Sequence, residues 1–302
     1  MIGTGGRWDR LEWPTYFIAS GIDRLIHGAP CHDHLLIAVN ELESERAIQG
    51  VRDFIKAGDR VLIDSGVFSL STTHAKKHGL TMDQALSMPP DQVDGFTELY
   101  ARYTALLAEM GDDVWGYIEI DQGGRENKIK TRARLEAIGL RPIPVYHPFN
   151  DGWDYFDYLA ERYDRICFGN VVQADFGTRK RLLATAWERR RKYPHLWIHM
   201  LGMTPGEISA AWPINSQDSS TWLLGVRWGH ANAMVANARE WTTGTGFKYK
   251  FGTEATSPRG HQKAVLLAGY EASMAKRMMH IIADEQREVL GVDIGLFDKG
   301  AA

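Results

Sequence analysis

The chain contains little cysteine: Cys31 and Cys167 are its two thiols in 302 residues. Two cysteines that lie far apart in the sequence form neither a disulfide framework nor a four-thiolate zinc site. No run of residues is apolar enough to cross a membrane. Residues 1–7 also lack the charged and apolar regions of a signal peptide. We therefore expect a cytoplasmic protein.

An excess of charge of one sign is also missing, since the formal net charge is -3 at pH 7. This balance gives no global reason for binding a polyanion, although a local basic surface would be sufficient. The length suits one large α/β domain. We expect a single domain over residues 1–302, with a barrel core at about 14–240 and a C-terminal helical extension at about 241–302.

Short apolar runs recur along the chain, separated by patterns of helical spacing. Because most of these runs do not alternate between apolar and polar residues, they are typical of strands buried on both faces of a parallel sheet. The sequence therefore predicts an α/β fold, a somewhat irregular (β/α)8 TIM barrel. The predicted strands are 16–20, 35–40, 60–65, 115–121, 142–147, 165–169, 196–201 and 214–218. The predicted helices are 91–110, 127–138, 151–163, 178–193 and 204–211.

Two segments fall outside the simple alternation. The stretch between Asp64 and Trp115 is long and contains Met88-Pro-Pro90, which predicts an inserted loop or lid. Near the C-terminus we expect a Gly/Thr/Lys-rich loop at 242–253 and a long helix at 263–289.

Three aspartates, Asp64, Asp121 and Asp218, stand at the ends of predicted strands. In a (β/α)8 barrel the carboxyl ends of the strands face the active site. Carboxylates collected there can act as nucleophile, general base or recognition group. His147 and His199 also end strands. They either orient the carboxylates, contact a sugar or are hydrogen-bonded structural histidines.

The string Cys-His-Asp-His at 31–34 is similar to the His-x-His pair of metal-dependent amidohydrolases. Together with His147, His199 and Asp218 it supports an alternative, a metal-dependent amidohydrolase-type TIM-barrel hydrolase. Both histidines of the string precede the apolar run 35–39, however, whereas metal ligands should follow a strand to reach the catalytic face. We therefore expect a turn or surface loop at this point.

Basic residues cluster in three places, and those near the C-terminus alternate with aromatic residues. Basic side chains interleaved with aromatics suit a phosphate backbone and splayed bases. A solvated helix face is the alternative interpretation. The candidate nucleic-acid contacts are Arg125, Lys128, Arg179, Lys180, Arg181, Lys248 and Lys250.

The order of the strand-end motifs resembles that of the tRNA-guanine transglycosylase superfamily, most closely its DNA-directed phage and bacterial branch, which inserts deazaguanines into DNA. The resemblance spans Val61 to Trp222. The matching strings are Asp64-Ser-Gly-Val-Phe68, Ile118-Glu-Ile-Asp121, Cys167-Phe-Gly-Asn-Val-Val172, Ile198-His-Met-Leu-Gly-Met-Thr204 and Gln217-Asp-Ser-Ser-Thr-Trp222.

Two features depart from the family pattern. Val67 and Asn170 replace the second glycine of two motifs. The tRNA enzymes carry a Cys/His zinc site in a C-terminal insertion, and this chain has no cysteine after Cys167. DNA is therefore favoured over tRNA as the substrate.

The resemblance implies base exchange through a covalent aspartyl–sugar intermediate. Asp218 would be the nucleophile and Asp64 the general acid/base, while Asp121 would accept hydrogen bonds from a 7-deazaguanine such as preQ0 or preQ1. The target nucleotide would have to leave its stack. The remaining substrate contacts would be Ser65, Gly66, Phe68, His147, Gly169, Asn170, His199 and Met200.

The same resemblance implies no cofactor and no metal, and places a phage-encoded protein in the host cytoplasm. Gly169 and Asn170 would let the backbone approach the base closely, and Phe68 or Met200 would cover its face. A non-catalytic nucleic-acid-binding barrel is the alternative from another class of protein.

Overall fold

The computed structural model describes residues 2–8, 15–26, 32–205, 214–223, 230–233 and 247–250. In this part of the chain, the short strands β1 to β8 alternate with helices, and their registered pairings are parallel. This is the α/β fold of the (β/α)8 type that the sequence predicted. The chain divides into two compact units. Unit 1 comprises residues 1–9 and 36–171, and unit 2 comprises residues 10–35 and 172–302.

Unit 1 holds a row of neighbouring parallel strands. They are β2 (His34–Ala38, of which the residues from Leu36 belong to this unit), β3 (Arg60–Asp64), β4 (Gly116–Tyr117), β5 (Val145–Tyr146) and β6 (Arg165–Phe168). Leu62 lies opposite Gly116, and a bridge between Ile118 and Ile143 connects the chain after β4 to the chain before β5. The strands are almost entirely buried, which explains why their sequences are continuous apolar runs.

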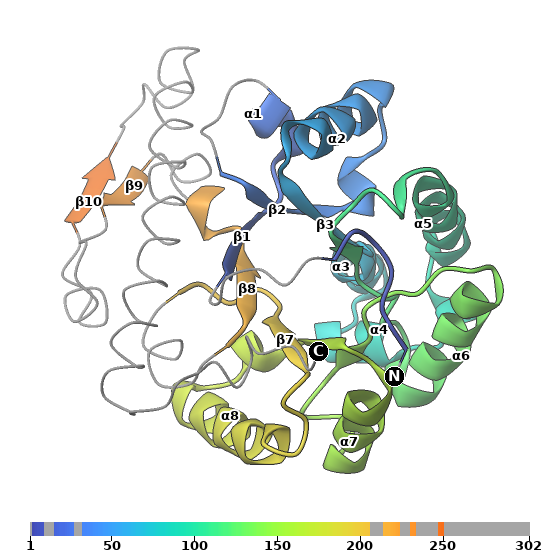
Figure 1. Ribbon diagram of the computed structural model, residues 1–302, viewed down its shortest axis with the longest axis vertical. Coiled ribbons are helices and arrows are strands. Elements are labelled where there is room, and N and C mark those ends of the chain that lie inside the picture. Colours follow the sequence, from blue (N-terminus) through green and yellow to red (C-terminus); the bar gives the residue numbers. More distant parts are fainter. Residues whose placement is uncertain are drawn as a thin grey trace. The chain divides into compact units, whose positions relative to one another are not determined.

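The helices of unit 1 begin and end at residues suited to those positions. Ser44 caps α2 by accepting the Ala47 N–H, and Thr81 and Gln84 form a capping box at α4. Figure 1 shows α2, α5, α6 and α7 arranged around the strands of this unit. The elements are η1 (Val39–Glu41), α2 (Glu45–Ala57), α3 (Val67–His78), α4 (Met82–Ser87), η2 (Pro90–Gln92), α5 (Phe96–Met110), α6 (Gly124–Ala137) and α7 (Trp153–Arg162).

The segment between β3 and β4 differs from the loop or lid that the sequence predicted. It consists mostly of the helices α3, α4 and α5. The proline pair does not open a long loop, because Pro90 begins the 3-10 turn η2. Gly95, with φ of 80°, then provides the left-handed residue from which α5 starts. The insertion is therefore a folded helical segment.

Unit 2 contains a second row of parallel strands, with β8 between β1 and β7. Phe17 lies opposite Asp218, and His199 lies opposite Ser216. The elements are β1 (Thr15–Ala19), α1 (Ile22–Ile26), η3 (Val171–Gln173, of which the residues from Val172 belong to this unit), α8 (Phe176–Arg190), β7 (Trp197–Met200), β8 (Ser216–Ser219) and η4 (Thr221–Leu223).

The C-terminal part of unit 2 departs from the expected loop. β10 (Phe247–Lys250) lies inside the stretch predicted as a loop and pairs antiparallel with β9 (His230–Ala233). The helix expected at 263–289, most of that expected at 204–211 and the limit of the barrel core near residue 240 lie outside the described residues. No helix among the described residues combines the length and apolarity needed to cross a lipid bilayer.

Candidate active site

Polar side chains follow each strand of unit 1 where the strand ends. They are Asn40 after β2, Asp64 at the end of β3, Asp121 after β4, His147 after β5 and Asn170 after β6. Since the carboxyl ends of neighbouring parallel strands meet at one edge of a sheet, these residues share one edge of the unit. Asp64, Asp121, His147 and Asn170 were predicted from the sequence, whereas Asn40 was not.

Asp121 and His147 form a hydrogen-bonded pair, with 3.0 Å between Oδ2 and Nε2. A carboxylate can only accept, so the Nε2–H of His147 donates. Burial raises the pKa of Asp121, but the hydrogen bond and charge of His147 and the ammonium of Lys128 outweigh it. The net pKa therefore lies below the usual value for an aspartate. Asp121 is an ionised acceptor rather than an acid at neutral pH.

Lys128 supports this pair instead of facing a nucleic acid. Its side chain and that of Asp151 are both 0% exposed and form an ion pair. Lys128 Nζ also donates to the Val145 carbonyl at 3.0 Å, and Asp151 Oδ2 accepts the His147 N–H at 2.7 Å. The prediction of a nucleic-acid contact at Lys128 is thus wrong, because a side chain buried in this way cannot reach a phosphate.

A second buried ion pair fixes the strand that carries His147. Glu119 Oε1 accepts the Val145 N–H at 2.6 Å, and Glu119 Oε2 accepts from Arg132 Nη1 at 2.7 Å. Arg132 also donates to the Tyr155 hydroxyl at 3.1 Å. Burial raises the pKa of Glu119, against the opposing charges of Arg132 and Lys128. Lys128 and Arg132 stand four residues apart on α6, which is the sequence pattern of one shared helix face.

Gly169 is required by the ring of His147. A Cβ at residue 169 would lie 2.6 Å from both Cδ2 and Nε2 of that imidazole. Nε2 is the atom that binds Asp121, so the absent side chain leaves the space in which the Asp121–His147 pair forms. This is a steric reason for glycine, distinct from the close approach of a base that the sequence suggested.

Replacing Gly169 with alanine should therefore displace the His147 ring. We expect a destabilisation of about 1–3 kcal/mol, typical of overpacking. Urea denaturation would measure it. Gly3→Ala is the matched control, because the nearest atom to its new Cβ is 3.9 Å away. Wild-type stability in Gly169→Ala would contradict the steric role given to this glycine.

Two amide oxygens along the edge of unit 1 are buried without a hydrogen-bond partner among the described residues. They are Asn40 Oδ1 and Asn170 Oδ1. Asn170 has a φ of 52°, a left-handed conformation that asparagine tolerates. Asn40 Oδ1 lies 2.8 Å from the position of a Cβ on Gly66, so a side chain at residue 66 would cover it. Unpaired buried acceptors are costly, and a ligand with N–H groups would satisfy them.

Asp64 begins the turn that leads into α3. Its Oδ2 accepts the Gly66 N–H at 3.0 Å, and Gly66 has a φ of 82°. Ser65 is buried, whereas Phe68, in the first turn of α3, is 60% exposed. Met200 on β7 is fully buried. Of the two side chains that the resemblance offered as a cover for a base, Phe68 is therefore accessible and Met200 is not.

In unit 2, Asp218 is held by two donors on one oxygen. Its Oδ1 accepts from His199 Nε2 at 3.1 Å and from the Gly202 N–H at 3.0 Å. Ser216 Oγ lies 2.8 Å from His199 Nδ1 and accepts from Trp197 Nε1 at 2.8 Å. The Ser216 proton can thus go to Nδ1, which leaves the Nε2–H of His199 to donate to Asp218. This chain of hydrogen bonds suits a histidine that orients a carboxylate and equally a hydrogen-bonded structural histidine, two of the three roles left open by the sequence.

The histidines at 32 and 34 differ from the expected surface loop. Both are buried, and His34 begins β2. His32 Nε2 lies 3.0 Å from the Tyr16 carbonyl, and His34 Nδ1 lies 3.0 Å from Asp33 Oδ1. Among the described residues, neither belongs to a group of three His, Cys, Asp or Glu side chains spaced for a metal. Cys31 lies outside the described residues.

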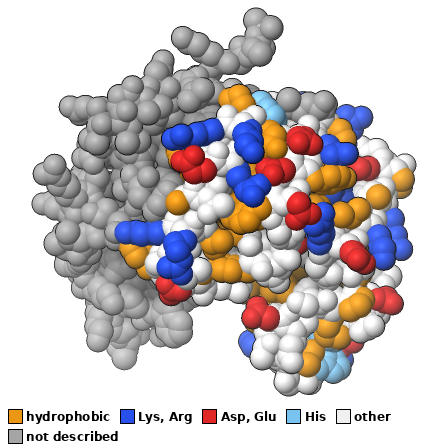
Figure 2. Space-filling view, turned by 90° about the horizontal axis from the view of Figure 1, so that it is seen from below, with side chains coloured by type: hydrophobic (Ala, Val, Ile, Leu, Met, Phe, Trp, Pro, Cys, Tyr) orange, Lys and Arg blue, Asp and Glu red, His pale blue; other side chains and the backbone are white. Residues whose placement is uncertain are grey.

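The other candidate nucleic-acid contacts differ in their surroundings. Arg125 pairs with Asp154 at 2.6 Å and lies 4.8 Å from the Tyr155 ring centroid. On α8, Lys180 lies over Phe176, while Arg179 and Arg181 donate to the Ala174 carbonyl and Thr178 hydroxyl. Lys248 and Lys250 are on β10, and their side chains are not described. On the face shown in Figure 2, basic and acidic side chains are interspersed rather than forming one basic tract.

No protein-family model and no curated protein matches the chain. Among solved structures, it is similar to the tryptophan synthase alpha chain from Legionella pneumophila subsp. pneumophila, with 11% identity, a TM-score of 0.46 and coverage of 89% of this chain and 91% of that one. The tryptophan synthase subunit alpha from Legionella pneumophila str. Paris gives 10% identity, a TM-score of 0.45 and coverage of 89% and 92%. Likeness at these values says nothing about the reaction.

Proposed function

We propose that the chain is a pentosyltransferase that exchanges guanine in nucleic acid for a 7-deazaguanine through a covalent aspartyl–sugar intermediate. The observation that carries the proposal is the Asp218 carboxylate, which His199 and Gly202 hold through one oxygen. A carboxylate ordered in advance is suited to attack an anomeric carbon. The order of motifs around it, with Asp64 and Asp121 at two other strand ends, is similar to that of the transglycosylase superfamily.

The proposed reaction has two displacements at C1′ of the target nucleotide. An Asp218 oxygen attacks C1′ while the bond from C1′ to guanine breaks, and Asp64 gives a proton to the departing base. The ring nitrogen of the deazaguanine then attacks C1′ and loses its proton to Asp64, while the aspartyl ester bond breaks. Both carboxyl groups return to their starting states, so no cofactor is consumed.

Unit 1 carries acceptors of the kind that the edge of such a base requires. Guanine and the deazaguanines present a ring N–H and an amino group, which are donors. Asp121 is an ionised acceptor, and the Asn40 and Asn170 amide oxygens have no partner among the described residues. A purine-like base would satisfy these acceptors, and a site built in this way rejects bases that lack the donors.

DNA is the proposed substrate, because the cysteines of the tRNA enzymes' zinc insertion are missing after Cys167. The test is incorporation of labelled preQ0 or preQ1 into single-stranded DNA, duplex DNA and tRNA. We expect incorporation into DNA, most readily into single strands, since a stacked base must first be flipped. Incorporation into tRNA alone would keep the chemistry and overturn the substrate. Binding of DNA without incorporation would favour the non-catalytic barrel.

The Asp121–His147 pair should set the acid limit of base binding. In His147→Phe the hydrogen bond and charge that lower the pKa of Asp121 are lost while its burial remains, so that pKa rises. Asp121 is then protonated at a higher pH, and free-base binding should fall off at a higher pH than in the wild type. Calorimetric titrations of preQ1 across the acidic range would show the shift. If preQ1 binding fell off at the same acidic pH in the wild type and in His147→Phe, Asp121 would not be the acceptor.

A further inference from the structure

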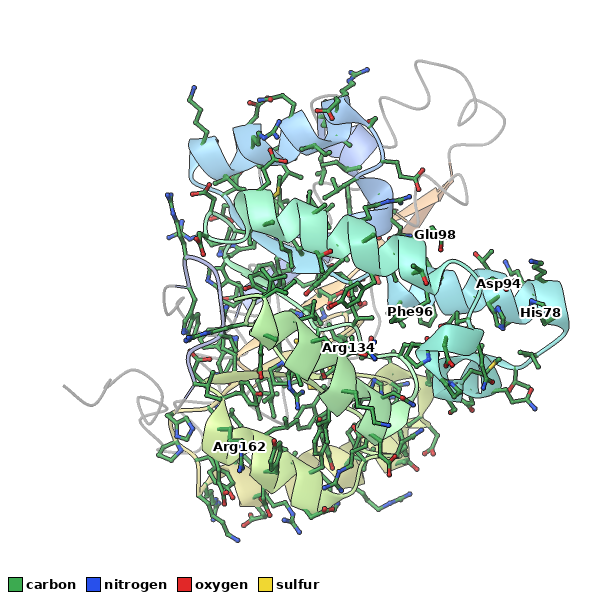
Figure 3. The ribbon with its side chains drawn as sticks, turned by 90° about the vertical axis from the view of Figure 1, so that its right-hand side faces the viewer. His78, Asp94, Phe96, Glu98, Arg134 and Arg162 are labelled. Atoms are coloured by element: carbon green, nitrogen blue, oxygen red, sulfur yellow. The ribbon has the colours of Figure 1, made fainter. Side chains whose placement is uncertain are left out.

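Three side chains in unit 1 gather between the end of α3 and the start of α5. They are His74, His78 and Asp94, and one ligand atom from each lies within 4.8 Å of the others. The two histidines are four residues apart on α3 and so share one face of the helix. In Figure 3 the helix that carries His78 projects from the rest of the unit, and Asp94 lies near His78.

The contacts resemble a coordination sphere in their spacing. Asp94 Oδ2 lies 2.8 Å from His78 Nε2 and 3.7 Å from His74 Nδ1. A tetrahedral ion with bonds of about 2.0–2.1 Å would separate neighbouring ligand atoms by about 3.3 Å, which lies between these two distances. His74 is buried, and its Nδ1 accepts the Asp94 N–H at 3.1 Å, a hydrogen bond that has to open when Nδ1 binds an ion. His78 and Asp94 are 43% and 48% exposed, so both can adjust.

We propose that His74, His78 and Asp94 bind one divalent transition-metal ion of the zinc type. Two imidazoles and one carboxylate are the ligands that Zn²⁺, Co²⁺ and Ni²⁺ accept, with water in the remaining position. Ca²⁺ and Mg²⁺ prefer sites made of oxygen and are excluded by the two ring nitrogens. The proposed metal site shares no residue with the proposed chemistry and does not depend on it.

Lys77 competes for the Asp94 carboxylate. Oδ2 of Asp94 accepts hydrogen bonds from both Lys77 and His78. Lys77 Nζ lies 2.7 Å from the same Oδ2 that faces His78. It therefore holds a position that a metal ion would take. Lys77 is largely exposed and can turn into solvent when an ion binds.

The ion would connect the last turns of α3 to Asp94, two residues before the start of α5. The chain between them contains α4 and η2, so the ion would close a helical insertion of the barrel. Metal binding to the folded form alone stabilises that form. The melting temperature of the full chain should thus rise with added Zn²⁺ in the wild type.

The experiment is calorimetric titration of ZnSO4 into the full chain after treatment with a chelator, with Co²⁺ absorption as a second readout. We expect one ion per chain, and a Kd at least about tenfold weaker in His78→Asn and in Asp94→Asn, since even outer partners of a metal site contribute this much. His195→Asn is the control and should bind like the wild type. Lys77→Gln should bind more tightly, because its competing ammonium is gone.

Several results would overturn the site. One is no binding of Zn²⁺ by the wild type at micromolar concentrations. Another is equal binding by the wild type, His78→Asn and Asp94→Asn, which would mean adventitious binding elsewhere. Weaker binding in Lys77→Gln would also contradict it, because a network made only of hydrogen bonds would lose a member in that variant. Because His78 and Asp94 are half exposed, these variants are expected to fold.

Discussion

Asp218→Asn should lose base exchange by roughly 10³-fold or more, the scale expected when a covalent nucleophile is removed. Asparagine has nearly the same shape and still offers an oxygen to His199 and Gly202, so the arrangement on β8 should persist. The amide cannot form the ester with C1′. The measurement is the initial rate at which labelled deazaguanine enters single-stranded DNA.

The matched control for this variant is Asp112→Asn, which changes an exposed aspartate and should leave the rate unchanged. Circular dichroism and urea denaturation would show that both variants fold. If Asp218→Asn exchanged bases at the wild-type rate, the nucleophile would have to be another residue. If Asp64→Asn alone removed the covalent step, the two assignments would be reversed.

Lys128→Ala should lower the free energy of unfolding by about 3–5 kcal/mol, the cost of removing one partner of a buried ion pair. Asp151 would be left charged in a site without solvent, and the Val145 carbonyl would lose a donor. Lys130→Ala, on the same helix but exposed, should stay within about 0.5 kcal/mol of the wild type. Urea denaturation of the three proteins measures the difference.

The same comparison separates two interpretations of Lys128. A structural lysine predicts loss of stability and, through the Asp151–His147 contact, weaker base binding. A phosphate-binding lysine would weaken DNA binding with stability unchanged and would reduce its salt dependence. Wild-type stability in Lys128→Ala together with weaker DNA binding would restore the interpretation made from the sequence.

The strands were predictable because they are buried on both faces. The runs 60–65 and 165–169 contain little except apolar residues between polar limits, and β3 and β6 occupy them. The predicted strands at 115–121 and 142–147 correspond to the two-residue β4 and β5. At these two places the buried residues continue beyond the residues that pair as strands. An apolar pattern indicates burial but not strand pairing, so it could not give the lengths of β4 and β5.

The places of Asp64, Asp121 and Asp218 were predictable, because each lies in or just after a strand that the apolar pattern indicates. The surroundings of a residue were not predictable where they depend on a distant partner. Lys128 looks like any basic residue of a helix until Asp151 is placed beside it. From the sequence, Gly169 indicated close approach of a base to the backbone, whereas the His147 ring occupies the space of its missing side chain.

Trapping the covalent intermediate tests the central claim most directly. The protein would be incubated with guanine-containing single-stranded DNA without added deazaguanine, denatured, digested and analysed by mass spectrometry. We expect a peptide carrying the nucleotide on Asp218, and its absence from Asp218→Asn. A sugar adduct on another residue, or base exchange at the full rate in Asp218→Asn, would contradict the double displacement proposed for Asp218.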